Sequence, residues 1–487
     1  MRILTILLSL VLSNVAPVLA QTSPASAARA WHLSRQAPIL DEFRELLAIP
    51  NVAANLNDMR RNAEFLRAMF AKRGIVLHTL DHPGAPAALF GEIRTPGARR
   101  TLMLYVHYDG QPVDPLQWTI TKPFEPVIRD DHIWARSASD DKAPFITITA
   151  ALDALKHASI GLGSNIKFFF DGEEEAGSPH IGPIIEKHKD LLGSDIWIFC
   201  DGPVHQNRMQ QIVFGARGST GLQITVYGPR RELHSGHYGN WATNPVVMLA
   251  HLLASMKDDE TGRVLVKDFY KDVVPLSEAE TSALSRAPRF DEELKRELGL
   301  ARVEGDGRRL DELINQPALN FQGIASAGVG PQTRNVIPAA GTAALGIRLV
   351  KGTDWRRMQD LVIAHIRSRG YHIVESDPDL ETRLKYPRIC KVARERGYNA
   401  VRAPMDLPIA RQIVAAVESA RGKVIQLPTL GGSLPIAPIS ETLNAPVILL
   451  PIANHDNNQH GHNENLRLRN LWDGIETMAA VLAARLD

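Results

Sequence analysis

The amino-acid sequence predicts an α/β protein in which a three-layer domain with a largely parallel central sheet is interrupted by an inserted α+β domain. Three observations support this prediction. Four short apolar runs show little alternation, which is typical of strands buried on both faces of a parallel sheet. Helical patterns separate these runs, as they do in βαβ units. The middle of the chain instead carries strands that alternate apolar and other residues, which is typical of a half-exposed sheet.

The first half of the chain alternates helical and strand patterns. Residues 28–49 and 56–75 have apolar positions at helical spacing, and residues 143–158 predict a third helix. The four apolar runs are RTLMLYVHYDG (100–110), NIKFFFDGEEE (165–175), SDIWIFCDG (194–202) and, near the end of the chain, APVILLPIANH (445–455). Because consecutive parallel strands need a helical crossover, this order predicts helices on both faces of one sheet.

The middle of the chain follows a different pattern. Residues 218–228 and 342–352 alternate as half-exposed strands do, and residues 371–376 predict a further strand. Residues 244–257 and 355–370 predict helices, and residues between 258 and 316 are charged and irregular, which indicates surface helices and loops. The predicted organisation is an N-terminal segment 1–20, a first domain part 21–213, an insertion 214–403 and a second domain part 404–487.

The N-terminus reads as a secretory signal peptide. Arg2 precedes an apolar stretch over residues 3–12, and Val18 to Ala20 provide small residues before Gln21, so cleavage after Ala20 is expected. An uncleaved anchor helix is the alternative. We expect an exported, periplasmic protein without a stable membrane span after processing. The net charge of +1 and the lack of a basic stripe argue against a nucleic-acid partner.

The chain has two cysteines, Cys200 and Cys390. In an exported protein they could form one disulfide, or Cys200 could be a buried thiol at the end of its apolar run. Two cysteines cannot build a thiolate zinc cluster. Any metal must therefore be held by His, Asp and Glu.

Imidazole and carboxylate groups follow each apolar run. They are His107 and Asp109, Glu173 to Glu175, Asp201 and, after a short loop, His460. Asp140 and Asp141 lie in a separate loop before a helix. The carboxyl ends of parallel strands form the ligand-binding edge of such sheets. Unpaired carboxylates there would repel one another, whereas a pair of divalent ions ~4 Å apart would hold them together, with one carboxylate bridging both ions. Zinc suits these ligands, with manganese and cobalt as alternatives.

The motifs, in their order, resemble a known family. LYVHYDGQP, ARSASDDKAP, DGEEEAGS, CDG, LHSGHYG, VIP…GIRLV, GGSLP and HGHNE occur as in the co-catalytic zinc amidohydrolases and peptidases. This group includes carnosine-type dipeptidases, carboxypeptidase G, acetylornithine deacetylase and succinyl-diaminopimelate desuccinylase. The resemblance covers nearly all of the mature chain and is closest to the dipeptidase branch, through LHSGHYG, IRLV and GGSLP. It implies that residues 21–213 and 404–487 form a catalytic domain and that residues 214–403 form a lid and dimerisation domain.

The resemblance implies two metal sites that share one carboxylate. Asp140 would bridge the metals, His107 and Asp201 would complete one site, and Glu175 and His460 would complete the other. Two divalent ions, zinc above all, are the implied cofactor.

The resemblance also implies a catalytic machinery around the metals. Glu174 would be the general base, and Asp109 would hydrogen-bond the second nitrogen of His107. His234 would stabilise the developing oxyanion in the active site of the partner subunit, which makes the working unit a homodimer. Glu173 has no implied chemistry, so we expect it on a solvated face.

Substrate binding is implied for a further group of residues. Arg348 would bind a substrate carboxylate, and Asn335 would contact the substrate. Ser433 would lie near the substrate's C-terminal end, where Gly431 and Gly432 allow the backbone to approach.

The expected function is that of a secreted di-metal hydrolase that cleaves dipeptides or short peptides next to a free carboxylate. Some features depart from the dipeptidase branch. Leu430 replaces an acidic residue, a His is missing from APMDLPIARQ, and Asp171 replaces a commoner Glu. A deacylase of N-acyl amino acids is therefore an alternative, and a non-catalytic periplasmic binding protein is another. No G-x-S-x-G motif supports a serine hydrolase.

Overall fold

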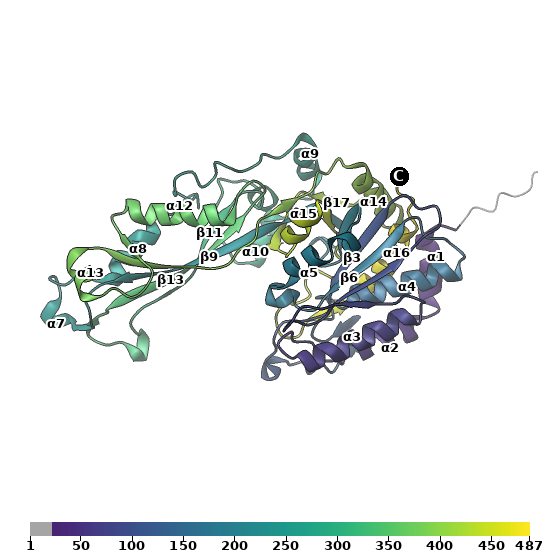
Figure 1. Ribbon diagram of the computed structural model, residues 1–487, viewed down its shortest axis with the longest axis horizontal. Helices are drawn as coiled ribbons and strands as arrows, with labels where there is room; N and C mark the ends of the chain where they lie inside the picture. The colour runs from purple at the N-terminus through teal and green to yellow at the C-terminus, as the bar shows by residue number, and fades with distance from the viewer. Residues whose placement is uncertain (1–21) are drawn as a thin grey trace, which may run out of the picture.

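Two large sheets organise residues 22–487, which are the residues that the computed structural model describes (Figure 1). The predicted signal peptide of residues 1–20 lies outside the described residues. One lobe contains an eight-stranded sheet, and a second, elongated lobe contains a seven-stranded sheet. Within residues 22–487, no helix combines the length and the apolar character needed to cross a bilayer.

The eight-stranded sheet has the order β1-β2-β6-β3-β7-β19-β8-β17. The four predicted apolar runs form its centre, and they pair in parallel as neighbours. They are β3 (Thr101–His107), β6 (Asn165–Asp171), β7 (Ile196–Phe199) and β19 (Val447–Leu449). The outer strands are β1 (His78–Leu80), β2 (Ala88–Ile93), β8 (Gln211–Val213) and β17 (Ile425–Leu427). The predicted, largely parallel sheet is confirmed.

Helices cover both faces of this sheet. On β6, Phe168 and Phe170 pack into one hydrophobic core, whereas Phe169 between them packs into the core on the opposite face. Full burial of such a side chain contributes about 2–3 kcal/mol, so the strand is anchored from both sides. The first core contains α1 (Pro24–Leu33), α2 (Gln36–Leu47), α3 (Leu56–Ala71), α4 (Ala143–His157), α14 (Pro408–Arg421) and α16 (Leu468–Ala483). The second contains α5 (Ile181–Lys187), α6 (Lys189–Leu192) and α15 (Ala437–Leu443).

The helical pattern at residues 28–49 forms two helices rather than one. Helix α1 ends at Leu33, and α2 begins at Gln36 with Pro38 in its first turn. A proline has no backbone N–H to donate to the preceding turn, so it is tolerated at a helix start but not in the interior.

The second lobe is built on the sheet β11-β13-β9-β15-β14. Five of its seven strands are β9 (Gly215–Tyr227), β11 (Ala318–Ala325), β13 (Ala340–Leu349), β14 (His372–Val374) and β15 (Ile389–Arg394). The other two, β16 (Val401–Arg402) and β18 (Leu430–Ser433), are short and pair with β9. Helices α8 (Pro245–Ala254) and α12 (Trp355–Ser368) cover one face, as Figure 1 shows. Along β13, buried residues alternate with mostly half-buried ones, which agrees with the alternating sequence pattern. The inserted α+β unit is therefore present, while its bounds at residues 214 and 403 stay a prediction.

Short elements complete the fold. They are β4 (Val127–Arg129), β5 (His132–Trp134), β10 (Leu233–His234), β12 (Val336–Ile337), β16 (Val401–Arg402), β18 (Leu430–Ser433), β20 (Asn465–Arg467), α7 (Ser235–Tyr238), α9 (Glu278–Arg286), α10 (Asp291–Glu297), α11 (Leu310–Leu313), α13 (Leu380–Lys385) and the 3-10 turns η1 (Pro115–Gln117), η2 (Glu174–Ala176) and η3 (Gly330–Gln332). The charged stretch 258–316 thus forms short helices and loops, as predicted.

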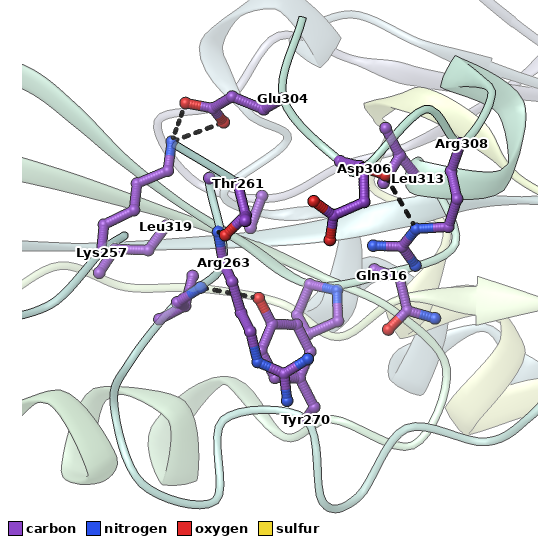
Figure 2. Close-up of a pocket in the computed structure, with 15 residues that line it drawn as sticks. Lys257, Thr261, Arg263, Tyr270, Glu304, Asp306, Arg308, Leu313, Gln316 and Leu319 are labelled. Atoms are coloured by element: carbon purple, nitrogen blue, oxygen red, sulfur yellow. Dashed lines mark hydrogen bonds and ion pairs between the residues drawn. The ribbon is translucent and has the colours of Figure 1, made fainter. Parts of the chain in front are cut away.

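A cavity of about 290 Å³ lies between this charged stretch and the start of β11 (Figure 2). Its lining includes several charged side chains, among them Lys257, Arg263 and Arg308. Lys257 Nζ forms an ion pair of 2.9 Å with the Glu304 carboxylate.

The two cysteines do not pair. Cys200 and Cys390 are both buried and free. Cys200 follows β7 in the central sheet, whereas Cys390 lies on β15 in the second lobe. The alternative of a disulfide is therefore wrong, and both thiols are part of hydrophobic cores.

Candidate active site

The site lies at the carboxyl edge of the central sheet. His107 is the last residue of β3, Asp201 follows β7 by two residues, and the glutamate run begins two residues after β6. Because β3, β6 and β7 are adjacent and parallel, their ends meet at one edge. Strand pairing therefore brings together side chains that lie far apart in the sequence.

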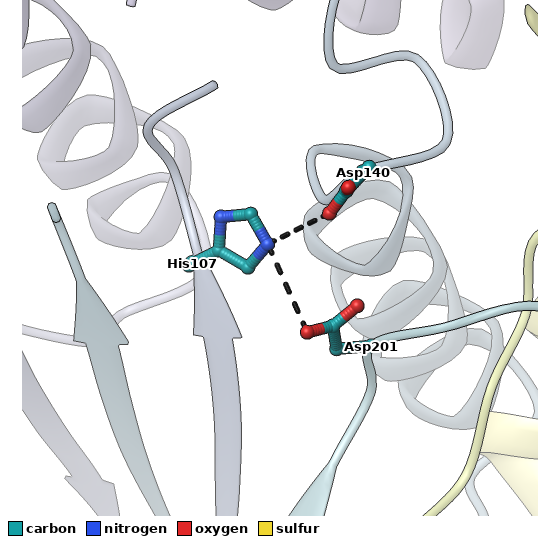
Figure 3. Close-up of side chains that lie close together, drawn as sticks. All are labelled: His107, Asp140 and Asp201. Carbon is teal, nitrogen blue, oxygen red and sulfur yellow. Dashed lines mark hydrogen bonds and ion pairs between the residues drawn. The ribbon is translucent and has the colours of Figure 1, made fainter. Parts of the chain in front are cut away.

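Five of the predicted residues form two groups that share Asp140. One ligand atom from each of His107, Asp140 and Asp201 lies within 4.8 Å of the others, and the same holds for Asp140, Glu175 and His460. His107 Nε2 lies 2.9 Å from Asp140 Oδ1 and 3.9 Å from Asp201 Oδ2 (Figure 3). His460 Nε2 lies 3.1 Å from Asp140 Oδ2 and 3.2 Å from Glu175 Oε2. The two oxygens of Asp140 therefore face different groups, as a bridging carboxylate requires.

The electrostatics of this cluster fit divalent cations. Burial, reinforced by the charge of Asp140, raises the pKa of Asp201 to about 6 and that of Glu175 to about 8. These shifts show that several carboxylates share a desolvated space in which negative charge is costly. Carboxylate oxygens and imidazole nitrogens without a thiolate suit zinc, manganese or cobalt. The residues present therefore fit a pair of such ions.

Asp109 connects the His107 side chain to the glutamate run. Its Oδ1 lies 3.3 Å from His107 Nδ1 and accepts a 2.9 Å hydrogen bond from the backbone N–H of Glu174. Its Oδ2 accepts a 3.0 Å hydrogen bond from the N–H of Glu175. Asp109 is fully buried, so it holds the ring of one candidate ligand and the backbone of another in a fixed relation.

The three glutamates of the run have different surroundings. No hydrogen bond to the Glu174 carboxylate is found within residues 22–487, and burial raises its pKa well above the usual range. Glu173 does not lie on a solvated face, so that expectation is wrong. It is 5% exposed, accepts a 2.9 Å hydrogen bond from the backbone N–H of His180 and contacts the His180 ring. The chain turns back after β6, and this turn encloses Glu173. Asp171, which stands before the run in place of a commoner Glu, is buried as well. Its carboxylate accepts a hydrogen bond from the Ser178 hydroxyl.

Arg348 and Ser433 approach each other from different parts of the chain. Arg348 lies on β13 of the second lobe, and Ser433 ends β18. Arg348 Nη1 donates a hydrogen bond of 2.5 Å to Ser433 Oγ. Gly431 and Gly432 precede Ser433 on the same strand. The predicted carboxylate-binding residues thus form one group.

His234 and Asn335 lie away from the metal-type cluster. His234 ends β10, which pairs with β12, and the backbone N–H of Ser235 donates to the Asn335 carbonyl at 3.0 Å. The adjoining helix α7 is at the far end of the second lobe, whereas β3 and β6 are in the other lobe (Figure 1). A single chain does not bring these two residues to the cluster.

Three residues at the site could not be inferred from the strand ends. Gln111 Nε2 donates to Glu175 at 2.8 Å, and Gln459 Nε2 donates to Asp140 at 2.7 Å. Glu464 is buried and accepts hydrogen bonds from the loop that carries Asp140. The only available signal was proximity in sequence, because each lies within five residues of a predicted site residue.

Several known proteins are similar to this chain. The human Beta-Ala-His dipeptidase is 27% identical over 400 residues, which cover 81% of this chain and 76% of the relative. The Cys-Gly metallodipeptidase DUG1 of Saccharomyces cerevisiae is 27% identical over 408 residues, covering 82% of each chain. The crystal structure of the M20 family metallo-carboxypeptidase Sso-CP2 from Sulfolobus solfataricus superposes with a TM-score of 0.79 at 24% identity, covering 92% of this chain and 99% of that one.

Human carnosine dipeptidase 1 has the same fold, with a TM-score of 0.74 at 23% identity over 94% of this chain and 99% of that one. The profile of Peptidase family M20/M25/M40 matches residues 103–484, which is well over half of the chain. The resemblance to the co-catalytic peptidases, the dipeptidase branch in particular, is confirmed, as is the prediction of a hydrolase. The chain belongs to peptidase family M20/M25/M40.

Proposed function

We propose that this protein is a two-metal dipeptidase that hydrolyses the amide bond next to a free substrate carboxylate. The observation that carries the proposal is the pair of ligand groups sharing Asp140, with the Glu174 carboxylate beside them. His107, Asp201, Glu175 and His460 would complete the two sites. Zinc is the proposed metal, and manganese and cobalt are the alternatives.

Metal ions in such a site supply Lewis-acid polarisation of the scissile carbonyl and lower the pKa of water. The remaining work falls to the side chains. Arg348 binds the substrate carboxylate together with Ser433, which orients the amide. Glu174 accepts a proton from the attacking water on a carboxylate oxygen and delivers it to the leaving amine nitrogen. Asp109 keeps His107 oriented through its second ring nitrogen.

The substrate class is supported by the relatives and qualified by Leu430. The similar proteins named Beta-Ala-His dipeptidase and Cys-Gly metallodipeptidase favour dipeptides. Leu430 lies where an acid would bind a substrate's free amine, and its half-buried apolar side chain cannot do so. This observation favours hydrolysis of N-acyl amino acids as the second candidate function. The intact Glu174 argues against a non-catalytic binding protein.

A homodimer is part of the proposal, because His234 would act in the partner's site. Trp241, three residues after α7, is 80% exposed, and Ile324 and Val329 of the same lobe are 61% and 82% exposed. Exposed apolar groups of this kind mark association surfaces in soluble proteins. Asn335 is next to His234 and would contact substrate from the same side.

We also propose that the protein is secreted across the inner membrane into the periplasm. Support comes from the charged start, the apolar stretch and the small residues before Gln21. Cell fractionation with N-terminal sequencing tests this part. A mature chain that starts at Gln21 in the periplasmic fraction is expected, and an intact N-terminus in the cytosol would contradict it.

The experiment that tests the catalytic proposal is a substrate screen of the purified protein. Dipeptides, N-acyl amino acids and acyl-diamino acids are offered to protein loaded with zinc or manganese, with and without a chelator. Hydrolysis of dipeptides that stops on chelation is expected. Faster hydrolysis of N-acyl amino acids would favour the second candidate. Binding without turnover, or turnover that is unaffected by the chelator, would contradict the proposal.

A further inference from the structure

A second cavity, of about 350 Å³, lies between the short helices α10 and α11 and the strand β18. This volume is in the range of pockets that bind small ligands. Most of its lining is apolar and includes Leu284, Phe290, Leu294, Ile314, Leu427 and Leu430. We call it the leucine cavity. An apolar hollow of this size leaves hydrocarbon surface that a ligand could cover.

Three chain segments run from the candidate active site into the wall of the leucine cavity. Pro203 follows Asp201 by two residues, and Gly431 precedes Ser433 by two. His455 lies five residues before His460. Pro203 forms a bridge with Ala453, so the first and third segments are also joined to each other. Short chain segments therefore connect the wall of the cavity to three of the candidate site residues, Asp201, Ser433 and His460.

The charges around the cavity select which end of a substrate enters it. In the described part of the chain, no lysine or arginine lines it, in contrast to the cavity of Figure 2. Three acids line it: Glu297 is exposed, and the two half-buried ones are already engaged. Asp311 accepts from Arg309 at 2.7 Å, and Asp291 accepts from the backbone N–H of Leu310 at 2.8 Å. The substrate carboxylate would thus stay with Arg348, and the cavity would receive the other end.

Gly431 allows β18 to pack closely against Ile314 in the wall of the cavity. A Cβ atom at Gly431 would lie 3.1 Å from Ile314 Cδ1, closer than side chains normally pack. The hydrogen bond of 2.8 Å from the Thr429 hydroxyl to Asn315 Oδ1 ties the α11 segment to the residues before β18. The cavity is therefore built jointly by the charged stretch of the inserted domain and by the GGS strand.

We propose that the leucine cavity binds a large apolar side chain on the N-terminal side of the scissile amide. The preferred substrates would be dipeptides with a bulky apolar first residue. This inference rests on the proposed function for the direction in which the substrate lies. Leu430 then has a positive role, since it forms part of an apolar subsite where an acid would be unfavourable.

Binding to the metal-free full chain tests the inference without turnover. Calorimetry compares leucylglycine, glycylglycine and glycylleucine. Leucylglycine is expected to bind about 10- to 100-fold more tightly than the other two, because only its apolar side chain reaches the cavity. Leu294→Trp fills the cavity and should remove this preference. Leu298→Trp is the matched control on the same segment, because Leu298 is 58% exposed and does not line the cavity.

A second variant guards against misfolding of the first. Leu310 is 44% exposed and lines the cavity, so Leu310→Asp should leave the fold intact and still weaken leucylglycine binding at least fivefold. Equal affinity for the three dipeptides, undetectable binding included, would overturn the inference. So would a leucylglycine preference that persists in both variants. Failure of the proposed function shows separately, as absence of hydrolysis by the metal-loaded wild type.

Discussion

The Glu464 carboxylate accepts a hydrogen bond of 3.0 Å from the backbone N–H of Asp140, although 324 residues separate the two in sequence. The same carboxylate accepts from the backbone N–H groups of Ser137 and Ser139 and from the Ser139 hydroxyl. Arg136 Nη1 completes the arrangement at 2.7 Å. Glu464 is completely buried, so the loop that presents the shared carboxylate is fixed by a single acid from the C-terminal segment.

Glu464→Gln should weaken metal binding although Glu464 is not one of the candidate metal ligands. The amide nitrogen of glutamine cannot accept the N–H bonds that the second carboxylate oxygen accepts, so the Asp140 loop would shift. A loss of about 10- to 100-fold in metal affinity is expected, measured by competition with a coloured chelator. Glu186→Gln, at a side chain that is 64% exposed, is the control and should bind metal normally. Unchanged affinity in Glu464→Gln would show that the loop holds its shape without the acid.

Metal content should separate the shared ligand from the single-site ligands. Asp140 belongs to both groups, whereas His460 belongs to one. Asp140→Asn is expected to lose both ions after dialysis, and His460→Gln is expected to keep one. Elemental analysis of the dialysed proteins gives the ratio of metal to chain. Equal losses in the two variants would contradict a bridging role for Asp140.

Mixed dimers test the proposed role of His234. His234 directly precedes α7, which lies at the tip of the second lobe, away from the lobe that contains β3 and β6. His234→Ala and Glu174→Gln homodimers should both be inactive, but co-expression should restore activity, because a mixed dimer contains one site with both residues intact. About a quarter of wild-type activity is expected from random pairing, since half of the dimers are mixed and each has one complete site. No recovery, with mixed dimers verified by mass spectrometry, would place His234 outside the partner's site.

The pH dependence of stability should contain a contribution from Glu476 on α16. Its carboxylate forms an ion pair of 2.8 Å with Arg29 Nη2 and lies 3.1 Å from His32 Nε2. Arg421 forms a further ion pair with it. Burial would raise the pKa of Glu476, but the contacts with His32 and Arg29 outweigh this effect and lower it to about 2. Because the folded pKa is depressed, the stabilisation is complete above about pH 4.5 and is lost as the pH falls through about 2.

Glu476→Gln measures that contribution. The variant should be less stable by about 2 kcal/mol near neutral pH, with allowance for solvent screening, and the difference should shrink below pH 4.5. Urea unfolding of the metal-free proteins across this range is the measurement. Metal-free samples are needed because acid also removes metal ions. A difference that is constant with pH would mean that packing, not charge, accounts for the loss.

Much of the site could be predicted because strand ends carry it. His107, Glu175 and Asp201 follow apolar runs whose parallel pairing places their ends at one edge. His460 follows the fourth run only after a loop and Asp140 lies in a separate loop, so the order of the motifs was needed to assign their places in the two metal sites. Glu173 was misjudged because its partner, His180, comes from the turn after it, and neither charge nor spacing indicates which side of a turn faces inward.

The leucine cavity could not be predicted for a related reason. Its lining comes from α10 and α11, which are short segments in a charged stretch without helical periodicity, and from β18 at the other side of the fold. The sequence showed only that Leu430 replaces an acidic residue. Tertiary packing, with Ile314 against Gly431, determines what takes the place of that acid.

The central claim is that Glu174 moves the proton in a reaction that needs metal at the neighbouring carboxylates. Glu174→Gln keeps the shape of the side chain and removes the base. The decisive measurement is kcat for a dipeptide substrate together with metal content, on wild type and Glu174→Gln prepared in parallel. The claim predicts unchanged metal content and a fall in kcat of at least about 100-fold. Full metal content with kcat within a few-fold of wild type would contradict it.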